Sequence, residues 1–343
     1  MEKLHHGVLY FDRGLSHLKE TCHALSLRGA ILADATLAKT HGAALQKALG
    51  YELIPVPSGE AFKTRETKQA LEDELLKRKL GRDTVLVALG GGVTTDLVGF
   101  LASTYMRGVP LVLIPTSLLA MVDAAIGGKT GVDTPLGKNL VGTFYLPKAI
   151  FIDVDLLKTL PPKEWLNGLA EVLKYGLIES PAIWEQCEKD WKKNVESLIR
   201  DSIQCKMKVV EQDPQEKGLR RILNFGHTVG HALELISHYK IAHGEAVAIG
   251  CMAESYLSHL LGFISQETLE RILRTYGKLG YSLKKFEAKP FLAALALDKK
   301  AKGGEPRFVL IDRIGHCLPF DGAYCQPVKQ TDLEKMIEWM NHG

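Results

Sequence analysis

The sequence predicts an α/β nucleotide-binding domain followed by a mainly α-helical domain. Over the first 150 residues, short apolar runs alternate with amphipathic segments, and one of these runs leads into a turn of three glycines. After Pro161-Pro162, apolar residues recur at three- and four-residue spacing, which is typical of helices. Alternating strands and helices form a parallel sheet with helices on its faces, and ligands bind such sheets at the carboxyl ends of the strands.

Length and composition are those of a two-domain globular protein. The chain has 343 residues, of which 46% are hydrophobic and 24% charged, and its net charge is +3. This near-neutral balance gives no reason to expect nucleic acid or a membrane surface as partner. The six cysteines have irregular spacing and no C-x-x-C pair, so we expect reduced thiols and a cytoplasmic protein. We expect neither a signal peptide nor a membrane span, since no apolar run approaches about 20 residues.

The predicted strands of the first half are short runs rich in Val, Ile and Leu. They are residues 29–34, 52–56, 84–90 and 111–116, with helical patterns near residues 36–48, 65–79 and 94–104. Residues 127–150 are too rich in Gly, Thr and Lys for a helix and predict a hairpin or an ordered loop. Residues 151–157 predict a further strand or strand-like run. Pro161-Pro162 then marks the domain boundary, giving domains of residues 1–160 and 161–343 with the active site in the cleft between them.

Helical periodicity dominates the second half. It predicts helices near residues 163–178, 193–212, 222–238 and 244–262. A turn-rich strand region at residues 307–320 precedes an amphipathic helix near residues 331–341.

The glycine-rich turn is Gly90-Gly91-Gly92-Val93-Thr94-Thr95-Asp96, between a predicted strand and a predicted helix. Glycines let the backbone approach a ligand closely, and the free N–H groups of a helix start suit pyrophosphate. Thr95 stands where the usual G-x-G-x-x-G pattern has its third glycine, so a plain tight turn is the alternative. Asp34 ends another strand, where it could accept ribose hydroxyls or simply cap the next helix. Thr116 and Ser117 also end a strand.

Histidines and a glutamate suggest a metal site. His227 and His231 are four residues apart and share one helix face, and His243 precedes the next helix. Glu171 lies in an apolar helical stretch where an unpaired carboxylate would be costly. Two histidines, one carboxylate and an open position would form a catalytic zinc site. The alternatives are satisfied core histidines and a surface pair between Glu171 and Lys174.

Basic and amide side chains form a second group of candidates. Glycines beside lysines suggest a loop that grips an anionic substrate, although a solvated basic surface would explain any single lysine. The residues are Arg107, Lys129, Lys138 and Asn139 in the first half, and Lys206, Arg220 and Asn224 in the second.

Six runs carry a resemblance to a known family. They are GGGVTTDLVGFLASTYMRGV (90–109), PTSLLAMVDAAIGGKTGVD (115–133), GKNL (137–140), AEVLKYGLIE (170–179), LNFGHTVGHALEL (223–235) and AHGEAVAIGC (242–251). With these runs the chain resembles 3-dehydroquinate synthase over nearly its full length. The resemblance implies a Rossmann-like NAD-binding α/β domain and a helical metal- and substrate-binding domain. It also implies a carbon–oxygen lyase that converts 3-deoxy-D-arabino-heptulosonate 7-phosphate to 3-dehydroquinate and phosphate, in aromatic amino-acid biosynthesis.

The resemblance also assigns roles to single residues. It implies zinc, or cobalt in its place, on Glu171, His227 and His243, and makes His231 a polar active-site residue instead of a ligand. It implies NAD contacts at Asp34, Ser58, Gly59, Glu60, Lys63, Gly91, Gly92, Val93, Thr94, Thr95, Asp96, Thr116, Ser117, Lys129, Lys138, Leu156, Leu157, Lys158 and Thr159. It surrounds the substrate with Asp123, Lys129, Asn139, Lys174, Lys206, Arg220, Asn224 and His231, with Lys299 or Lys300 as a phosphate contact. Arg107 is expected to reach the neighbouring subunit's site in a homodimer.

Some positions depart from the commonest family pattern. Ser117 replaces a second threonine, Ala125 a serine and Asp133 an asparagine, and Thr94-Thr95 replace the usual pair. Other functions fit part of the sequence: a 2-epi-5-epi-valiolone or 2-deoxy-scyllo-inosose type of cyclase, a metal-dependent polyol or alcohol dehydrogenase, and a non-catalytic, zinc-stabilised NAD-binding protein. The Gly137-Lys138-Asn139 run, with Arg220 and Asn224, favours the heptulosonate substrate over those of the other cyclases. A dehydrogenase would not explain the lysine-rich loop or the EVLKYG run, and the clustered substrate-type residues argue against a non-catalytic protein.

Overall fold

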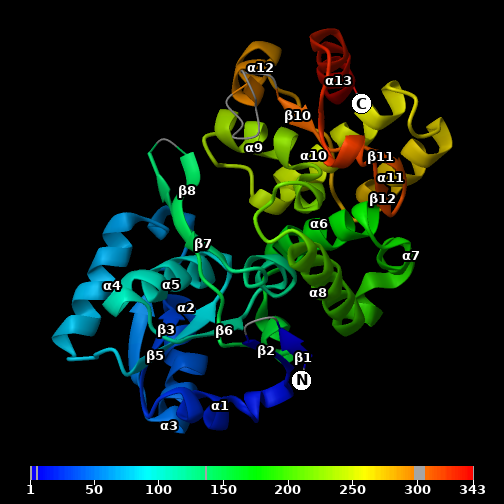
Figure 1. Ribbon diagram of the computed structural model, residues 1–343. Helices are drawn as coiled ribbons and strands as arrows, with labels where there is room; N and C mark the ends of the chain where they lie inside the picture. The colour runs from blue at the N-terminus through cyan, green and yellow to red at the C-terminus, as the bar shows by residue number, and fades with distance from the viewer. Residues whose placement is uncertain (1, 5–6, 136, 297–305, 343) are drawn as a thin grey trace. The chain divides into compact units, whose positions relative to one another are not determined.

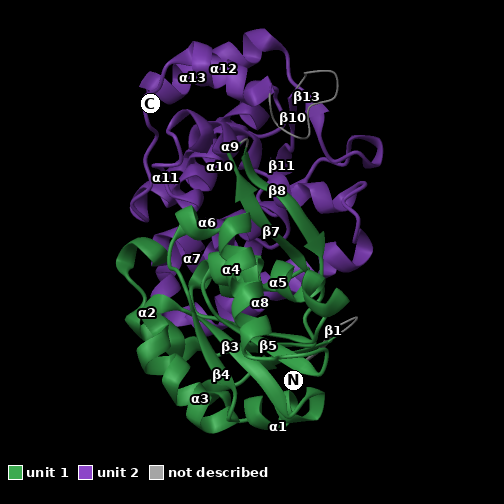
Figure 2. Cartoon of the chain, turned by 90° about the vertical axis from the view of Figure 1, so that its left-hand side faces the viewer, with its two compact units in different colours: residues 1–164 green, residues 165–343 purple. Residues whose placement is uncertain are grey.

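The structure is a computed structural model that describes residues 2–4, 7–135, 137–296 and 306–342 (Figure 1). The chain divides into two compact units, Met1–Glu164 and Trp165–Gly343 (Figure 2). The first unit is built on a sheet and the second is mainly helical, as the sequence predicts.

The first unit contains a seven-stranded sheet in the order β1-β2-β9-β6-β5-β3-β4. All neighbouring strands are parallel except β1 and β2. The strands are β1 (Glu2–Leu4), β2 (Gly7–Phe11), β3 (Arg28–Asp34), β4 (Glu52–Val56), β5 (Thr84–Gly90), β6 (Leu111–Pro115) and β9 (Ala149–Ile152). Every residue of β5 and β6 is buried, which explains their continuous apolar runs. The register pairs Asp34 with Val56 and Gly90 with Pro115, so the carboxyl ends of these strands are aligned.

Helices cover the sheet. Side chains of α1 (Leu18–Leu25) and α3 (Ala43–Leu49) join the core formed with Val85, Val87 and Leu89 of β5, and α5 (Gly92–Thr104) packs against β5 and β6. The remaining helical segments of the unit are α2 (Ala35–Leu37), α4 (Arg65–Lys77), the π-helical turns Ala38–Gly42 and Ala120–Ala124, and the 3-10 turns Arg13–Leu15, Glu60–Phe62, Tyr105–Arg107 and Val154–Thr159.

Residues 127–150 contain an antiparallel hairpin, one of the two expected forms. Its strands are β7 (Lys129–Thr134) and β8 (Gly137–Phe144), and β7 packs against α5. The expected strand at residues 151–157 is confirmed only at Phe151 and Ile152 and is wrong from Asp153 on. β9 ends at Ile152, and the Asp153 carboxylate accepts the Asp155 N–H at 2.9 Å, which starts a 3-10 turn instead. The sequence patterns did not indicate β1 and β2.

In the second unit, α10 is the most deeply buried helix: 13 of its 18 residues are buried, including Glu254 and Ser258. The unit's helices are α6 (Pro162–Ile178), α7 (Pro181–Asp190), α8 (Val195–Gln212), α9 (His227–Ile236), α10 (His243–Leu260), α11 (Gln266–Lys278), α12 (Ala288–Ala296) and α13 (Gln330–His342), with 3-10 turns at Trp191–Asn194, Leu219–Asn224 and Phe320–Gly322. The turn-rich region forms two short pairs, β10 (Arg307–Phe308) with β13 (Gln326–Pro327) and β11 (Ile311–Arg313) with β12 (His316–Cys317). No helix in the described part of the chain is long and apolar enough to span a membrane.

The helix expected at residues 222–238 begins later than the periodicity indicates. Gly226 has a φ of 79°, in the left-handed region, and α9 starts only at His227. A Cβ on Gly226 would lie 2.5 Å from Cys251 Sγ of α10, so the two helices meet where only glycine fits. This break makes His227 the first residue of its helix.

Candidate active site

Glu171 lies on α6 in a stretch, Gly168–Ile178, that is buried at every position. Its carboxylate is wholly buried, and Lys174 Nζ lies 2.5 Å from Oε2. The alternative of a surface Glu171–Lys174 pair is therefore wrong: the pair exists, but it lies inside the protein. A buried carboxylate beside a lysine and two imidazoles is an organised polar site.

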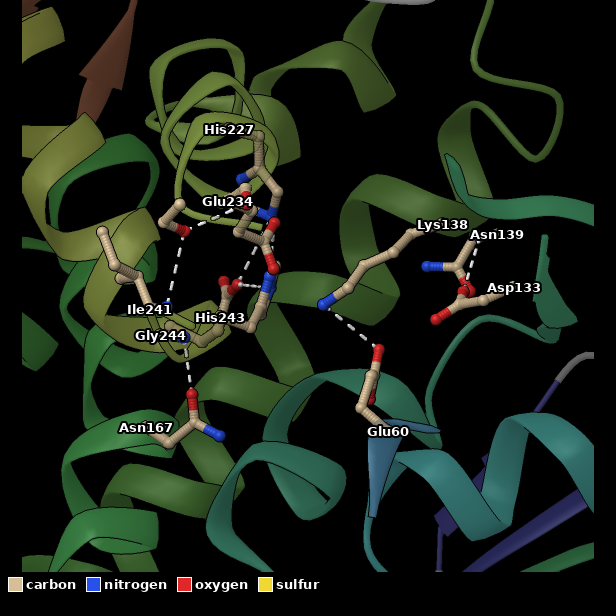
Figure 3. Close-up of polar contacts among 12 residues, drawn as sticks. Glu60, Asp133, Lys138, Asn139, Asn167, His227, Glu234, Ile241, His243 and Gly244 are labelled. Atoms are coloured by element: carbon tan, nitrogen blue, oxygen red, sulfur yellow. Dashed lines mark hydrogen bonds and ion pairs between the residues drawn. The ribbon is translucent and has the colours of Figure 1, made fainter. Parts of the chain in front are cut away.

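His227 of α9 and His243 of α10, both labelled in Figure 3, approach this carboxylate from two other helices. The Nε2 atom of His227 lies 3.4 Å, and that of His243 3.3 Å, from Glu171 Oε1. One ligand atom from each residue lies within 4.8 Å of the others. The structure thus brings together the three residues expected to bind the metal.

The geometry of these atoms fits zinc. A tetrahedral zinc with bonds of about 2.0–2.1 Å separates its ligand atoms by roughly 3.3 Å. The Nε2–Oε1 separations have this length. Neither carboxylate oxygen of Glu171 accepts a regular hydrogen bond from the described residues. Two imidazoles and one carboxylate could therefore hold zinc and leave a fourth position for substrate.

Burial and neighbouring charges shift the pKa values of all three candidate ligands. Burial alone would raise the pKa of Glu171, but the Lys174 ammonium and His227 outweigh it and hold this pKa well below its usual range. Burial lowers the pKa of His227 despite the neighbouring Glu171. Burial also acts to lower the pKa of His243, but Glu171 and Glu234 raise it to about 10. The site therefore holds an ionised carboxylate, as divalent metal binding requires, and a metal bound there would displace the proton from His243.

His231 lies one helical turn after His227 and outside the ligand group. Its ring centroid is 5.4 Å from that of His227, and its side chain is exposed. Of the two histidines on this helix face, His227 is a candidate ligand and His231 is exposed to solvent.

Three polar residues that the sequence patterns did not assign surround the ligands. Glu234 Oε2 lies 3.6 Å from His243 Nδ1, and Asn167 Oδ1 accepts the Gly244 N–H at 2.5 Å (Figure 3). Glu254 accepts the Gly226 N–H at 2.8 Å. Glu234 and Glu254 are both buried. The signal that identified Glu171, a carboxylate in an apolar helix, also exists at Glu234 and Glu254.

The expected substrate residues of the second unit are mostly buried. Lys174, Lys206 and Arg220 are 1%, 8% and 2% exposed, which rules out a solvated basic surface for these three. Asp213 fixes the loop before Arg220 by accepting the N–H groups of Lys217, Gly218 and Arg220. Asn224 donates to Glu216 at 2.6 Å. Lys299 and Lys300 lie outside the described residues.

In the first unit, expected dinucleotide residues gather at the carboxyl ends of the strands. Asp34 accepts the Thr36 N–H at 2.9 Å and the Ser58 hydroxyl at 2.6 Å, so it caps α2 and also contacts another expected NAD residue. The Thr116 N–H donates to Gly90 O at 2.9 Å, and a Cβ on Gly91 would lie 3.4 Å from Ser117 Oγ. The glycine turn and the end of β6 are thus neighbours.

Lys63 connects this turn with the hairpin. Its Nζ donates to Asp96 Oδ2 and to Asn139 Oδ1, both at 2.6 Å, and its side chain is buried. Burial would lower the pKa of Lys63, but Asp96 and Glu60 raise it above its usual value. Asp133 accepts the Asn139 N–H at 2.8 Å, and Lys138 pairs with Glu60 at 3.2 Å (Figure 3). Burial raises the pKa of Asp133, against the Asn139 N–H and Lys63.

The other expected positions are more scattered. Asp123 is half-buried in a π-helical turn, Lys129 is exposed at the start of β7, and Arg107 is exposed with a φ of 69°. In the 3-10 turn after β9, Leu157 is buried and Leu156 packs against the core, whereas Lys158 and Thr159 are exposed. Gly59 has a φ of 101°.

Comparisons with known proteins agree with this arrangement. The family model described as 3-dehydroquinate synthase N-terminal matches residues 53–167, and the one described as 3-dehydroquinate synthase C-terminal matches residues 168–301. A 3-dehydroquinate synthase of Thermosynechococcus vestitus is 42% identical over 319 residues, 88% of this chain and 87% of that protein. One of Nitrosospira multiformis is 44% identical over 272 residues, 76% of this chain and 74% of that protein.

A solved structure shares the whole fold. It is a 2-epi-5-epi-valiolone synthase from Streptomyces hygroscopicus subsp. jinggangensis with NAD+ and Zn2+ bound. It superposes with a TM-score of 0.88 at 29% identity and covers 100% of this chain and 98% of that one. The curated relatives are markedly more similar in sequence than this cyclase. The chain therefore belongs to the 3-dehydroquinate synthase family.

Proposed function

We propose that the chain converts 3-deoxy-D-arabino-heptulosonate 7-phosphate to 3-dehydroquinate and phosphate, with NAD and one zinc ion as cofactors. The convergence of Glu171, His227 and His243 is the observation that carries the proposal. The solved relative with NAD+ and Zn2+ bound supports the choice of cofactors, and a related 2-deoxy-scyllo-inosose synthase with NAD+ and Co2+ supports cobalt as a substitute.

The two cofactors would supply the chemistry that amino-acid side chains lack, namely Lewis-acid polarisation and hydride transfer. Bound zinc would supply Lewis-acid polarisation of a substrate hydroxyl and bound NAD would supply reversible hydride transfer, chemistry that would permit β-elimination of phosphate and ring closure without net oxidation. Glu171, His227 and His243 would hold the metal. Asp34, Ser58 and the turn from Gly91 to Asp96 would hold the dinucleotide, because a strand end and a helix start offer acceptors for ribose and donors for phosphate.

The polar residues of both units would bind and orient the substrate. Lys174, Lys206 and Arg220 would bind its carboxylate and phosphate, because buried cations attract anions much more strongly than solvated ones do. Asn224 and Asn139 would donate hydrogen bonds to substrate hydroxyls, and Lys129 and Asp123 would also contact the substrate. His231, being exposed next to the ligands, would take up or release a proton. Holding one conformer lowers the entropic cost of ring closure.

A homodimer is part of the proposal. Arg107 is exposed on a turn in which Met106 and Arg107 both have left-handed φ, and this turn is held by the Gly108 N–H donating to Tyr105 O at 2.8 Å. An exposed arginine is suited to binding a phosphate in a partner subunit's site.

The decisive experiment incubates the purified protein with the heptulosonate phosphate and NAD. We expect phosphate and 3-dehydroquinate in equal amounts, a requirement for NAD, and no accumulation of NADH. Steady NADH accumulation would indicate a dehydrogenase, and turnover only with a different sugar phosphate would indicate another cyclase. His227→Ala should lose both bound zinc and turnover, and stoichiometric zinc in that variant would refute the ligand assignment.

A further inference from the structure

Both histidines of the candidate metal site are the first residues of their helices. His227 begins α9 and His243 begins α10. The first N–H groups of a helix have no partner within it, and helix ends fray unless something satisfies them. The position of each imidazole therefore depends on what holds its helix start.

The start of α9 is held by a side chain from another helix. Glu254 of α10 is wholly buried, and its carboxylate accepts the Gly226 N–H at 2.8 Å and the Val229 N–H at 3.4 Å. Gly226 occupies the capping position and has no side chain of its own. The close approach of Cys251 leaves no room for one. Glu254 thus acts as the N-cap of α9, where a negative charge is also favoured by the helix dipole.

The other histidine ligand is held in a related way. Asn167 lies one turn before Glu171 on α6, and its Oδ1 accepts the Gly244 N–H at the start of α10. Glu234 lies two turns after His227 on α9, and its Oε2 lies 3.6 Å from His243 Nδ1. This contact leaves Nε2 of His243 directed at Glu171. Each ligand-bearing helix therefore also carries a side chain that positions a ligand of another helix.

We propose that Glu254 is a positioning residue that holds His227 in its metal-binding position, and that Asn167 and Glu234 do the same for His243. The inference rests on the proposed metal role of Glu171, His227 and His243. Glu254 touches none of these three side chains in the contacts described above and acts through the backbone of α9. Loss of such an outer partner typically weakens metal binding about 10- to 100-fold.

The test measures zinc affinity in wild type, Glu254→Ala and Glu254→Gln, by competition with a chromogenic chelator. A parallel measurement gives the Tm of each protein with and without zinc. The matched control is Ser258→Ala. Ser258 is also wholly buried on α10, but its hydroxyl donates to Glu254 O at 2.9 Å and accepts the Ile311 N–H, so it does not contact α9 in these bonds. The Glu254 variants and Ser258→Ala all lose buried hydrogen bonds, but only the Glu254 variants lose the cap of α9.

We expect Glu254→Ala to bind zinc about 10- to 100-fold more weakly than wild type and to show a smaller zinc-induced rise in Tm. Ser258→Ala should keep wild-type zinc affinity even if its Tm falls. Glu254→Gln keeps one acceptor oxygen but turns an NH2 group toward the second N–H, so we expect about tenfold weaker binding.

The outcomes separate the two proposals. If wild type binds no zinc, the proposed metal role fails. If wild type binds one zinc and the Glu254 variants bind it equally well, or if Ser258→Ala weakens binding as much as they do, the positioning role is refuted. Should Glu254→Ala fail to fold, Glu254→Gln decides alone, and wild-type affinity in that variant overturns the inference.

Discussion

The ammonium of Lys174 lies 2.5 Å from Oε2 of Glu171, three residues earlier on α6, and both side chains are almost completely buried. A buried charge without its partner is costly, and removing one member of such a pair typically destabilises a protein by about 3–5 kcal/mol. In the zinc-free protein, Lys174 therefore supplies the positive charge that Glu171 needs.

Lys174→Met should lower the stability of the zinc-free protein by about 3–5 kcal/mol. Zinc should restore much of this lost stability, because the metal then neutralises Glu171. Phosphate release should be abolished with or without zinc, because Lys174 is also proposed to bind the substrate. Calorimetry with and without zinc measures the effect. The control is Lys208→Met, because Lys208 is exposed and pairs with Glu179 away from the ligands. An equal zinc-induced Tm rise in wild type and Lys174→Met would contradict the prediction.

Lys63→Met should weaken NAD binding and raise the KM for the heptulosonate phosphate together, each by at least about tenfold. The reason is that one ammonium holds both Asp96 at the glycine turn and Asn139 in the hairpin. Isothermal titration with NAD and steady-state kinetics measure the two effects. Lys68→Met is the control, because Lys68 is similarly shielded but pairs with Glu72 on α4. A change in only one of the two constants would argue against Lys63 as the link.

Arg107→Ala should lose turnover but keep zinc and NAD binding, because Arg107 is exposed and is not among the residues proposed to hold zinc or NAD. If it acts in the partner's site, mixing Arg107→Ala with His227→Ala should restore about a quarter of wild-type activity, since random exchange gives half heterodimers with one complete site each. Each variant alone should stay inactive. Failure of the mixture to regain activity, with subunit exchange demonstrated, would exclude action across the dimer.

Glu188→Gln should destabilise the protein by roughly 0.5–1 kcal/mol at pH 7 and by almost nothing near pH 3. Arg271 donates to both oxygens of Glu188, at 2.9 and 2.6 Å, and this pairing holds the pKa of Glu188 below its usual 4.5. A lowered carboxyl pKa contributes stability that is present above pH 4.5 and disappears as the pH falls through the folded-state pKa. Urea unfolding at several pH values tests this, with Glu338→Gln on α13 as an exposed control. A pH-independent difference would rule out the charge as its cause.

Some features follow from local sequence because local physics determines them. The runs of β3, β5 and β6 are largely or wholly buried strands, so their apolar continuity is visible without the fold. The edge strand β4 buries only Ile54 and Val56. The glycine turn lies between β5 and α5 as the pattern predicts, because glycine permits a backbone path that other residues resist. Burial cost alone marked Glu171 as unusual, and the structure buries it completely.

Other features needed the tertiary structure. Periodicity treats one helix at a time, so it pairs His227 with His231 and gives no reason to prefer His243. The preference arises where α9 and α10 meet: a Cβ on Gly250 would lie 1.8 Å from Gly226 O, and this contact starts α9 at His227 and lets His243 approach Glu171. Glu254 and Asn167 hold backbone N–H groups 28 and 77 residues away, which no local pattern encodes. Local sequence patterns predict the strands, the turn and the buried carboxylate, and the family resemblance predicts the ligand set. The alignment of the ligands depends on close packing between helices that are distant in the chain.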